Sequence, residues 1–355
     1  MTETDNIVVE TAERIFADLA DAQTINKSTD GKWKVALWQA LAESGLPLSW
    51  VPEDCDGSGA SMAEGFAVIG AAGRAGLSVP LAETMLAGWW LAQAKIASPD
   101  GMMTVAPTHP KDRLTLNADG TISGRARGVP FASQVQHIAV IASGAGGGSI
   151  ALVEAGACRI EQGLNLANDP SDIVSFDRVT PLSIAPAPAG IDARSLQLMG
   201  ALLRSLQISG AMESMLDISV TYAGERVAFE KKISKFQAVQ HNLARLAGET
   251  SAALAAASSA ADALSNDNVA YDDAILLEVA AAKIRCGEAA EKGAAIAHQL
   301  FGAIGFTQEH ILHRFTLRAL AWRDDFGSER FWAVELGRMV AARGADELWP
   351  LVASR

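Results

Sequence analysis

The sequence is poor in cysteine and has no surplus of positive charge. Only three of its 355 residues are cysteine, Cys55, Cys158 and Cys286, and they lie far apart, without the close spacing typical of metal ligands. We therefore expect reduced thiols and no metal centre. The net charge of −12 at pH 7 argues against nucleic acid or an anionic membrane as the main partner.

Two kinds of apolar segment are also missing. The start, MTETDNIVVE, is acidic and contains neither the basic nor the apolar region of a secretory signal. No apolar run reaches the roughly 18 residues that a membrane-spanning helix needs. We therefore expect a cytoplasmic protein. His310 and His313 can share a helix face, but no further ligands lie near them in the sequence, so we expect packing or surface histidines there.

The residues that are present divide the chain into three zones. Half of them are apolar and a fifth are charged, as in an ordinary globular protein. Residues 1–98 have helical spacing, residues 99–190 contain short β-prone runs, and residues 191–355 are helical again and rich in alanine. We predict an N-terminal helical domain (1–98), a small middle antiparallel β domain (99–190) and a C-terminal four-helix bundle (191–355). The fold class is thus mainly α with a small β domain.

Turn-forming residues mark the ends of the predicted helices and strands. Gly45-Leu46-Pro47 ends one helix of the first zone. Residues 117–120 (NADG) and 144–148 predict reversals between strands. The Pro/Ala segment 181–190 predicts an extended linker. Four helical patterns follow, at about 192–226, 234–266, 271–303 and 308–345, and the last contains a Gly-Ser turn at 327–328 that opens a new helix.

Three motifs of the last zone have unusual residue combinations. They are ERVAFEKKISKFQAVQHNLA (225–244), QLFGAIG (299–305) and WRDDFGSER (322–330). Together with the order of the three zones they resemble the acyl-CoA dehydrogenases, a family of FAD-dependent β-oxidation enzymes. The resemblance spans nearly the whole chain, is strongest from 200 to 345, and implies a cofactor, FAD, and an acyl-CoA substrate.

The first two motifs resemble the parts of the family that reach the FAD of a neighbouring subunit. By this resemblance Arg226 holds the pyrophosphate or adenosine part, Phe229 packs near the adenine and Gln237 helps to orient the group. A guanidinium suits this role because it presents several donors to phosphate oxygens in one plane. Glu230 stands where the family usually has glycine.

The second motif implies close approach of the backbone to the adenine end of the same cofactor. The residues concerned are Gln299, Gly302 and Ala303, and Ala303 replaces one glycine of the family pattern. A glycine cap at the end of a helix explains the same pattern, and both interpretations are compatible.

The third motif lacks the family's catalytic base. Phe326 occupies the position of the glutamate that removes the substrate α-proton, and a phenyl ring cannot accept a proton. Some members place the glutamate on an earlier helix, but that position is Gly200, followed by Ala201 where the family has arginine. The resemblance therefore implies no catalytic residue in this chain. It also implies that Ser328 meets the flavin.

The β zone also departs from the family. Catalytic members carry a T-E-P-x-A-G-S-D-like strand and a K-x-x-I-[ST]-N-like strand around the flavin ring, and the first has no recognisable counterpart in residues 99–142. Taken together, the losses resemble the short, non-catalytic subunit of bacterial α₂β₂ acyl-CoA dehydrogenases. Such a subunit completes the FAD site of a homologous catalytic partner, and the assembly passes electrons to an electron-transfer acceptor. Bulky acyl groups such as steroid side chains are the implied substrates.

Three alternatives stay open. One is a homotetrameric dehydrogenase with a relocated base, for which Asp324, Asp325 and Glu225 are the candidates. A second is a related flavin monooxygenase or oxidase that does not need glutamate at this position. The third is a structural paralogue that binds no flavin.

Overall fold

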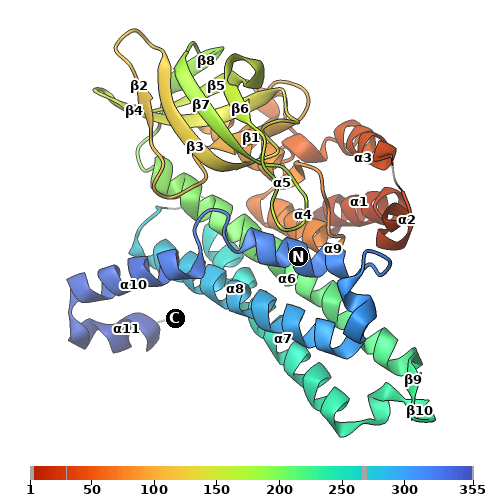
Figure 1. Cartoon of the computed structure of the whole chain (residues 1–355). Helices are drawn as coiled ribbons and strands as arrows, with labels where there is room; N and C mark the ends of the chain where they lie inside the picture. Colours follow the sequence, from red (N-terminus) through yellow and green to blue (C-terminus); the bar gives the residue numbers. More distant parts are fainter. Residues whose placement is uncertain (1–3, 29, 266–269, 354–355) are drawn as a thin grey trace.

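The computed structural model describes residues 4–28, 30–265 and 270–353. Along the chain, a group of helices is followed by a sheet and then by a second group of helices (Figure 1). The N-terminal helices are α1 (Thr4–Leu19), α2 (Ala22–Asn26), α3 (Lys32–Glu43), α4 (Met62–Arg74) and α5 (Leu81–Gln93). The strands begin at Met103 and end at Pro186, and the helices resume at Ala193. The predicted fold class is confirmed.

Local sequence explains where these helices begin and end. Ser61 caps α4 in a reciprocal pair: its hydroxyl accepts from the Glu64 backbone N–H (3.2 Å) and the Glu64 carboxylate accepts from the Ser61 N–H (2.7 Å). Gly45 has φ +74° just after α3, a conformation that favours glycine. The predicted end of this helix is therefore confirmed.

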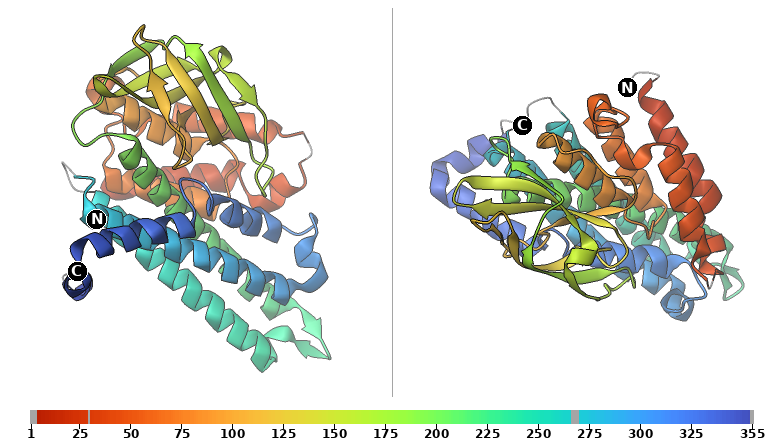
Figure 2. Two further views of the ribbon diagram at one scale, coloured as in Figure 1. Left: turned by 60° about the vertical axis from the view of Figure 1, so that its left-hand side comes forward. Right: turned by 90° about the horizontal axis from the view of Figure 1, so that it is seen from above.

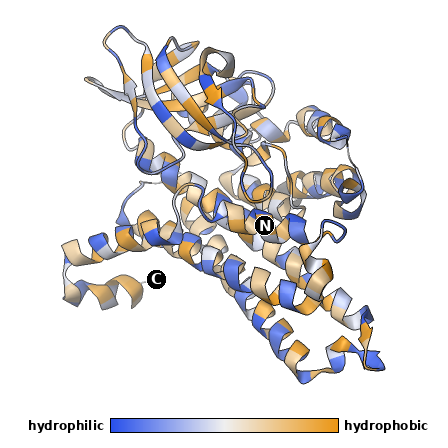
Figure 3. Cartoon of the chain, in the orientation of Figure 1, coloured by the Kyte–Doolittle hydropathy of each residue, from blue (hydrophilic) through white to orange (hydrophobic). Residues whose placement is uncertain are grey.

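The β domain is one eight-stranded sheet, and its strands contain both hydrophilic and hydrophobic residues (Figure 3). Its path is β6-β7-β3-β2-β4-β5-β8, with β1 beside β4. The bounds are β1 (Met103–Ala106), β2 (Leu114–Leu116), β3 (Ile122–Pro130), β4 (His137–Gly144), β5 (Gly147–Glu154), β6 (Arg159–Glu161), β7 (Ser171–Val179) and β8 (Ser183–Pro186). Most pairs are antiparallel as predicted, but β4 pairs with β1 and β2 in parallel.

The segment predicted as an extended linker, 181–190, contributes a strand. Its residues 183–186 form β8, which pairs with β5 at an edge of the sheet. Proline is tolerated there because an edge strand needs only half of its backbone groups for pairing. Both predicted reversals are present, between β2 and β3 and between β4 and β5.

The C-terminal helices pack as a bundle around α6 (Figure 2). They are α6 (Ala193–Glu225), α7 (Gln237–Leu264), α8 (Asp273–Phe301), α9 (Leu312–Trp322) and α10 (Glu329–Arg343), followed by the short α11 (Leu348–Ala353). A two-stranded ribbon, β9 (Val227–Ala228) with β10 (Lys231–Lys232), joins α6 to α7. The fourth predicted helical pattern is two helices, α9 and α10, because Phe326 (φ +55°) and Gly327 (φ +99°) leave the helical conformation.

Small residues allow α4 and α6 to cross at close range. A Cβ added to Gly73 would lie 2.3 Å from the Gln207 carbonyl oxygen, and one added to Gly210 would lie 2.2 Å from the Gly70 carbonyl oxygen. This crossing joins the N-terminal helices and the bundle in one hydrophobic core, while the sheet has a second core of its own. Among the described residues no helix is long and apolar enough to span a membrane.

Candidate functional site

The two positions at which the family resemblance places a base contact each other. Phe326, between α9 and α10, is 3% exposed. A Cβ added to Gly200 of α6 would lie 2.1 Å from Cδ1 of the Phe326 ring. A side chain at position 200 and this ring therefore exclude one another. The indole of Trp332 donates a hydrogen bond to the Phe326 carbonyl oxygen (3.1 Å) and holds the turn in place.

The carboxylates proposed as relocated bases do not converge on this point. Asp325 accepts a hydrogen bond from Nε of the buried Arg204 (2.9 Å), which also pairs with Glu83 (2.6 Å). Although burial opposes its charge, Glu83 and Asp325 raise the pKa of the Arg204 guanidinium. Asp324 is exposed, and Glu225 is exposed at the far end of α6. Asp325 is thus engaged in a buried ion pair and does not present a free base.

The space beside this ion pair is nearly filled. The cavity between the sheet and the bundle that Phe131, Arg204, Trp322 and Asp325 line has a volume of about 10 Å³. That volume holds about one water molecule, so the three fused rings of a flavin do not fit. Phe131 itself has φ +56° at the end of β3 and is 6% exposed.

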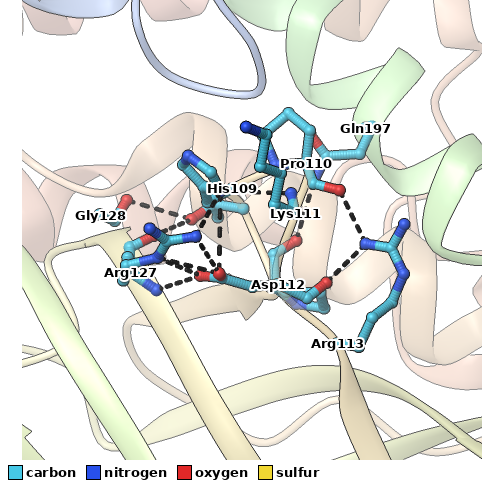
Figure 4. A network of polar contacts seen from close by, with 10 residues as sticks. His109, Pro110, Lys111, Asp112, Arg113, Arg127, Gly128 and Gln197 are labelled. Atoms are coloured by element: carbon cyan, nitrogen blue, oxygen red, sulfur yellow. Dashed lines mark hydrogen bonds and ion pairs between the residues drawn. The ribbon is translucent and has the colours of Figure 1, made fainter.

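A larger space lies between the β domain and the N-terminal ends of α6 and α10. This outer cleft has a volume of about 1220 Å³. Its walls include the loop that follows β1, the first turns of α6, and Ser328, whose hydroxyl caps α10 by accepting from the Phe331 N–H (3.4 Å). Figure 4 shows the polar contacts of the loop, with Gln197 beside it.

Six of the seven predicted cofactor-binding residues lie together at the opposite end of the bundle. We call this the bundle-end surface; it consists of Arg226, Phe229, Gln237, Gln299, Gly302 and Ala303. They come from the end of α6, the start of α7 and the end of α8, near the β9–β10 ribbon (Figure 1). All six are exposed, so they are open to a second subunit. Ser328, the seventh, lies apart from them in the outer cleft.

The geometry of the bundle-end surface suits the adenosine diphosphate end of a cofactor. Phe229 is 89% exposed and has φ +51°, so its ring projects into solvent. Gly302 has φ +63° and no atom within 4 Å of an added Cβ, which leaves its backbone open. Gln299, Gly302 and Phe306 line a groove of about 490 Å³. An aromatic face, a guanidinium and open backbone are groups that a nucleotide can use.

Several buried polar residues escaped the motif analysis. Arg204 and Glu83 lie within the apolar runs LMGALLRS and LAETMLAGWW. A single charged residue in such a run could have indicated a buried ion pair. Lys283 is 1% exposed and donates to the carbonyl oxygens of Trp322 and Arg323 (both 2.7 Å). Burial lowers the pKa of Lys283 to about 8. Lys283 therefore caps the C-terminal end of α9, the helix that precedes Phe326.

Comparison with known proteins is consistent with this arrangement. Residues 2–94 match the family profile "Acyl-CoA dehydrogenase, N-terminal domain", and residues 195–329 match "Acyl-CoA dehydrogenase, C-terminal domain". Acyl-CoA dehydrogenase IpdE2 of Mycobacterium tuberculosis is 27% identical over 326 residues, which cover 91% of this chain and 89% of that protein.

Solved structures share the fold over nearly the whole chain. The Tcur3481-Tcur3483 steroid ACAD G363A variant has a TM-score of 0.83 at 22% identity, covering 96% of this chain and 98% of that one. The ChsE4-ChsE5 complex from Mycobacterium tuberculosis also has a TM-score of 0.83, at 21% identity, covering 97% and 99%. At this level of identity the likeness concerns the fold alone.

Proposed function

The chain belongs to the acyl-CoA dehydrogenase family, and we propose that it is a short, non-catalytic subunit that completes the FAD site of a homologous catalytic partner. The observation that carries this proposal is the contact between Phe326 and Gly200, because it fills both positions for a base with one apolar pair. The chain thus keeps the family scaffold without a group that removes the α-proton.

The distribution of exposed residues supports a shared cofactor site. The bundle-end surface offers Arg226 and Phe229 to a neighbouring molecule, whereas the chain's own inner cavity has a volume of only about 10 Å³. Bound FAD supplies the hydride acceptor for α,β-dehydrogenation of an acyl-CoA. In the assembly, Arg226 and Gln237 of this chain would hold the phosphate part, and Phe229 would cover the adenine.

The similar proteins suggest the partner and the substrate. Two of the solved structures are the Tcur3481-Tcur3483 steroid ACAD and the ChsE4-ChsE5 complex. We therefore propose a heterotetramer that acts on a bulky acyl-CoA such as a steroid side-chain thioester, passes electrons to an electron-transfer acceptor, and works in the cytoplasm in lipid breakdown.

Co-expression with a catalytic acyl-CoA dehydrogenase tests the proposal. We expect the chain purified alone to be nearly free of FAD and inactive, and the co-purified complex to be yellow and active. Arg226→Ala should weaken FAD retention by the complex at least tenfold, because a charge-assisted hydrogen bond contributes roughly 1.5–3 kcal/mol. Arg159→Ala is the matched control, since Arg159 is an exposed arginine on the β domain.

The alternatives give different results in the same experiment. Stoichiometric FAD with enoyl-CoA formation by the isolated chain would support a homotetrameric dehydrogenase with a relocated base. FAD with oxygen consumption would support a flavin monooxygenase or oxidase. Absence of FAD from every complex would support a structural paralogue. Unchanged FAD retention in Arg226→Ala would contradict the role of Arg226.

A further inference from the structure

We propose that the half-buried cations Lys34 and Arg314, beside the ring of Trp33, form a site for a dianionic phosphate or sulfate group. Lys34 and Trp33 belong to the first turn of α3, and Arg314 belongs to the first turn of α9. Asp169, in the loop between β6 and β7, joins the β domain to α9 at this junction. Neither the bundle-end surface nor the outer cleft contributes a residue, so the proposal goes beyond the proposed function and does not depend on it.

The carboxylate at this junction is already committed to another arginine. Asp169 is 4% exposed, and both of its carboxylate oxygens contact the buried Arg318: Nη2 donates to Oδ1 (3.1 Å), and Nε lies 3.0 Å from Oδ2. The Ser78 hydroxyl also donates to Oδ1. The negative charge of Asp169 therefore compensates Arg318, and neither Lys34 nor Arg314 forms an ion pair within the described ranges.

Arg314 carries a positive charge without a partner. It is half-buried, and its Nε and Nη2 are buried without a hydrogen-bond partner in the part of the chain that the structure describes. Its guanidinium carbon lies 5.9 Å from the centre of the Trp33 ring. Burial lowers the pKa of Arg314 to about 10, and Arg318 contributes to the same shift, but the group stays charged at neutral pH. Buried donors without acceptors are costly, so an anion is the natural partner of this guanidinium.

Lys34 adds a second positive charge at the same place. Its Nζ lies 5.8 Å from the centre of the same Trp33 ring. Burial lowers the pKa of the Lys34 ammonium, Asp169 raises it, and Arg318 and Arg314 lower it further. The two arginines are thus close enough to act on the lysine. Because Asp169 compensates Arg318, the junction holds two positive charges in excess, in a chain whose net charge is −12.

This excess of charge determines the class of ligand. An anion with two negative charges compensates both cations, whereas chloride or acetate leaves one of them without a partner. Ammonium and guanidinium groups both bind phosphate oxygens through charge-assisted hydrogen bonds. Unlike Nε and Nη2, the Arg314 Nη1 and the Lys34 Nζ are not fully buried, so an anion reaches them from solvent. The group belongs either to a free ion or to a phosphate monoester whose organic part lies on the half-buried Trp33 ring.

Thermal unfolding of the full chain in sodium phosphate, sulfate or acetate tests the site, with sodium chloride keeping the ionic strength constant so that general screening does not change. An anion that binds only the folded state raises the Tm as its concentration passes the Kd. We expect phosphate and sulfate, but not acetate, to raise the Tm in a saturable way. Lys34→Met and Arg314→Met should each lower the apparent affinity about tenfold. Phenyl phosphate distinguishes the two sources: tighter binding than inorganic phosphate indicates an ester, and equal binding indicates a free ion.

The stability without a dianion gives a second measurement. Arg314→Met keeps an apolar stem and removes an uncompensated charge, so its Tm in chloride alone should equal or exceed that of the wild-type chain. Arg285→Met is the matched control, because the Arg285 side chain is also largely buried (26% exposed) but pairs with Glu249 and with Glu288 (2.8 Å). This control should lower the Tm and keep the full response to phosphate.

Three results would overturn the proposal. The first is a wild-type Tm that phosphate and sulfate raise no more than acetate does. The second is a full response to phosphate in both Lys34→Met and Arg314→Met, because the dianion would then bind elsewhere on the chain. The third is a loss of Tm in Arg314→Met, in chloride alone, as large as that in Arg285→Met, because the guanidinium would then be compensated within the chain.

Discussion

At the scale of single residues, Gly200 and Phe326, the two positions at which the family resemblance places a base, contact each other. The glycine and the ring share one space, so the absence of a side chain at 200 and the presence of a ring at 326 depend on each other. Phe326→Ala should destabilise the fold by about 3–5 kcal/mol, as is usual when a buried phenylalanine is truncated. Gly200→Ala should cost about 1–3 kcal/mol, because its Cβ would overlap the ring.

A double-mutant cycle separates this contact from general core packing. The variant with both changes should be more stable than the sum of the two losses predicts, since the new Cβ enters the space that the ring leaves. Urea unfolding of the four proteins measures the coupling. Losses that simply add would mean that the two positions do not share this space. The pair Gly210→Ala and Phe326→Ala is the control, because Gly210 contacts α4 and not the ring.

At the scale of elements, the β9–β10 ribbon is where the chain departs from the family in a way that can be tested. The family usually has glycine where this chain has Glu230, and Glu230 adopts φ +64° in the turn. The left-handed backbone conformation costs a residue with a Cβ about 1–2 kcal/mol. Glycine avoids this strain, but it loses more conformational freedom on folding, which offsets part of the gain. Glu230→Gly should therefore raise the free energy of unfolding by about 0.5–1 kcal/mol.

Urea unfolding of Glu230→Gly and Glu230→Ala measures this effect. The alanine variant keeps the strained conformation and should not gain stability, so it separates backbone strain from the removal of a charge. A glycine variant that is no more stable than the alanine variant would contradict the argument. Because Glu230 adjoins Phe229, FAD retention by the complex should be measured on the same two variants.

The helices, most strands and the turns could be predicted because they depend on local spacing. Gly45 and the turn at 117–120 mark their elements in the sequence itself. The strand β8 and the parallel pairing of β1 could not be predicted, because a short edge strand is defined by the partner it finds. The convergence of Arg226, Gln237 and Gln299 could be anticipated only through the family resemblance, because they belong to three separate segments: the residue after α6, the start of α7 and the end of α8.

The outer cleft and the buried charges were not predictable in the same way. Gln197 stands out only when the structure leaves its oxygen without a partner in the described ranges, and Lys111 and Arg113 read as ordinary surface residues. Arg204 is a charge within an apolar run, but the sequence does not identify Glu83, 121 residues away, as its partner. Long-range pairs of this kind follow from the way the domains dock.

At the scale of the whole molecule, Arg204 joins the N-terminal helices to the bundle and to the turn before Phe326. Its guanidinium is 3% exposed and pairs with Glu83 of α5 and with Asp325. Removal of one member of a buried ion network leaves the other charges without compensation and costs roughly 3–5 kcal/mol. Arg204→Met should therefore destabilise the chain by about this amount, measured by urea unfolding at neutral pH.

The triple variant Glu83→Gln, Arg204→Met, Asp325→Asn distinguishes charge pairing from the packing of the arginine side chain. Replacement of a whole buried ion network by neutral groups is often nearly neutral for stability, so the triple variant should recover most of the loss. If it were as unstable as Arg204→Met alone, the stem of Arg204 would stabilise the junction mainly through packing. Because the network also adjoins the inner cavity, which Phe131 and Trp322 continue to line, we expect that the triple variant still does not retain FAD.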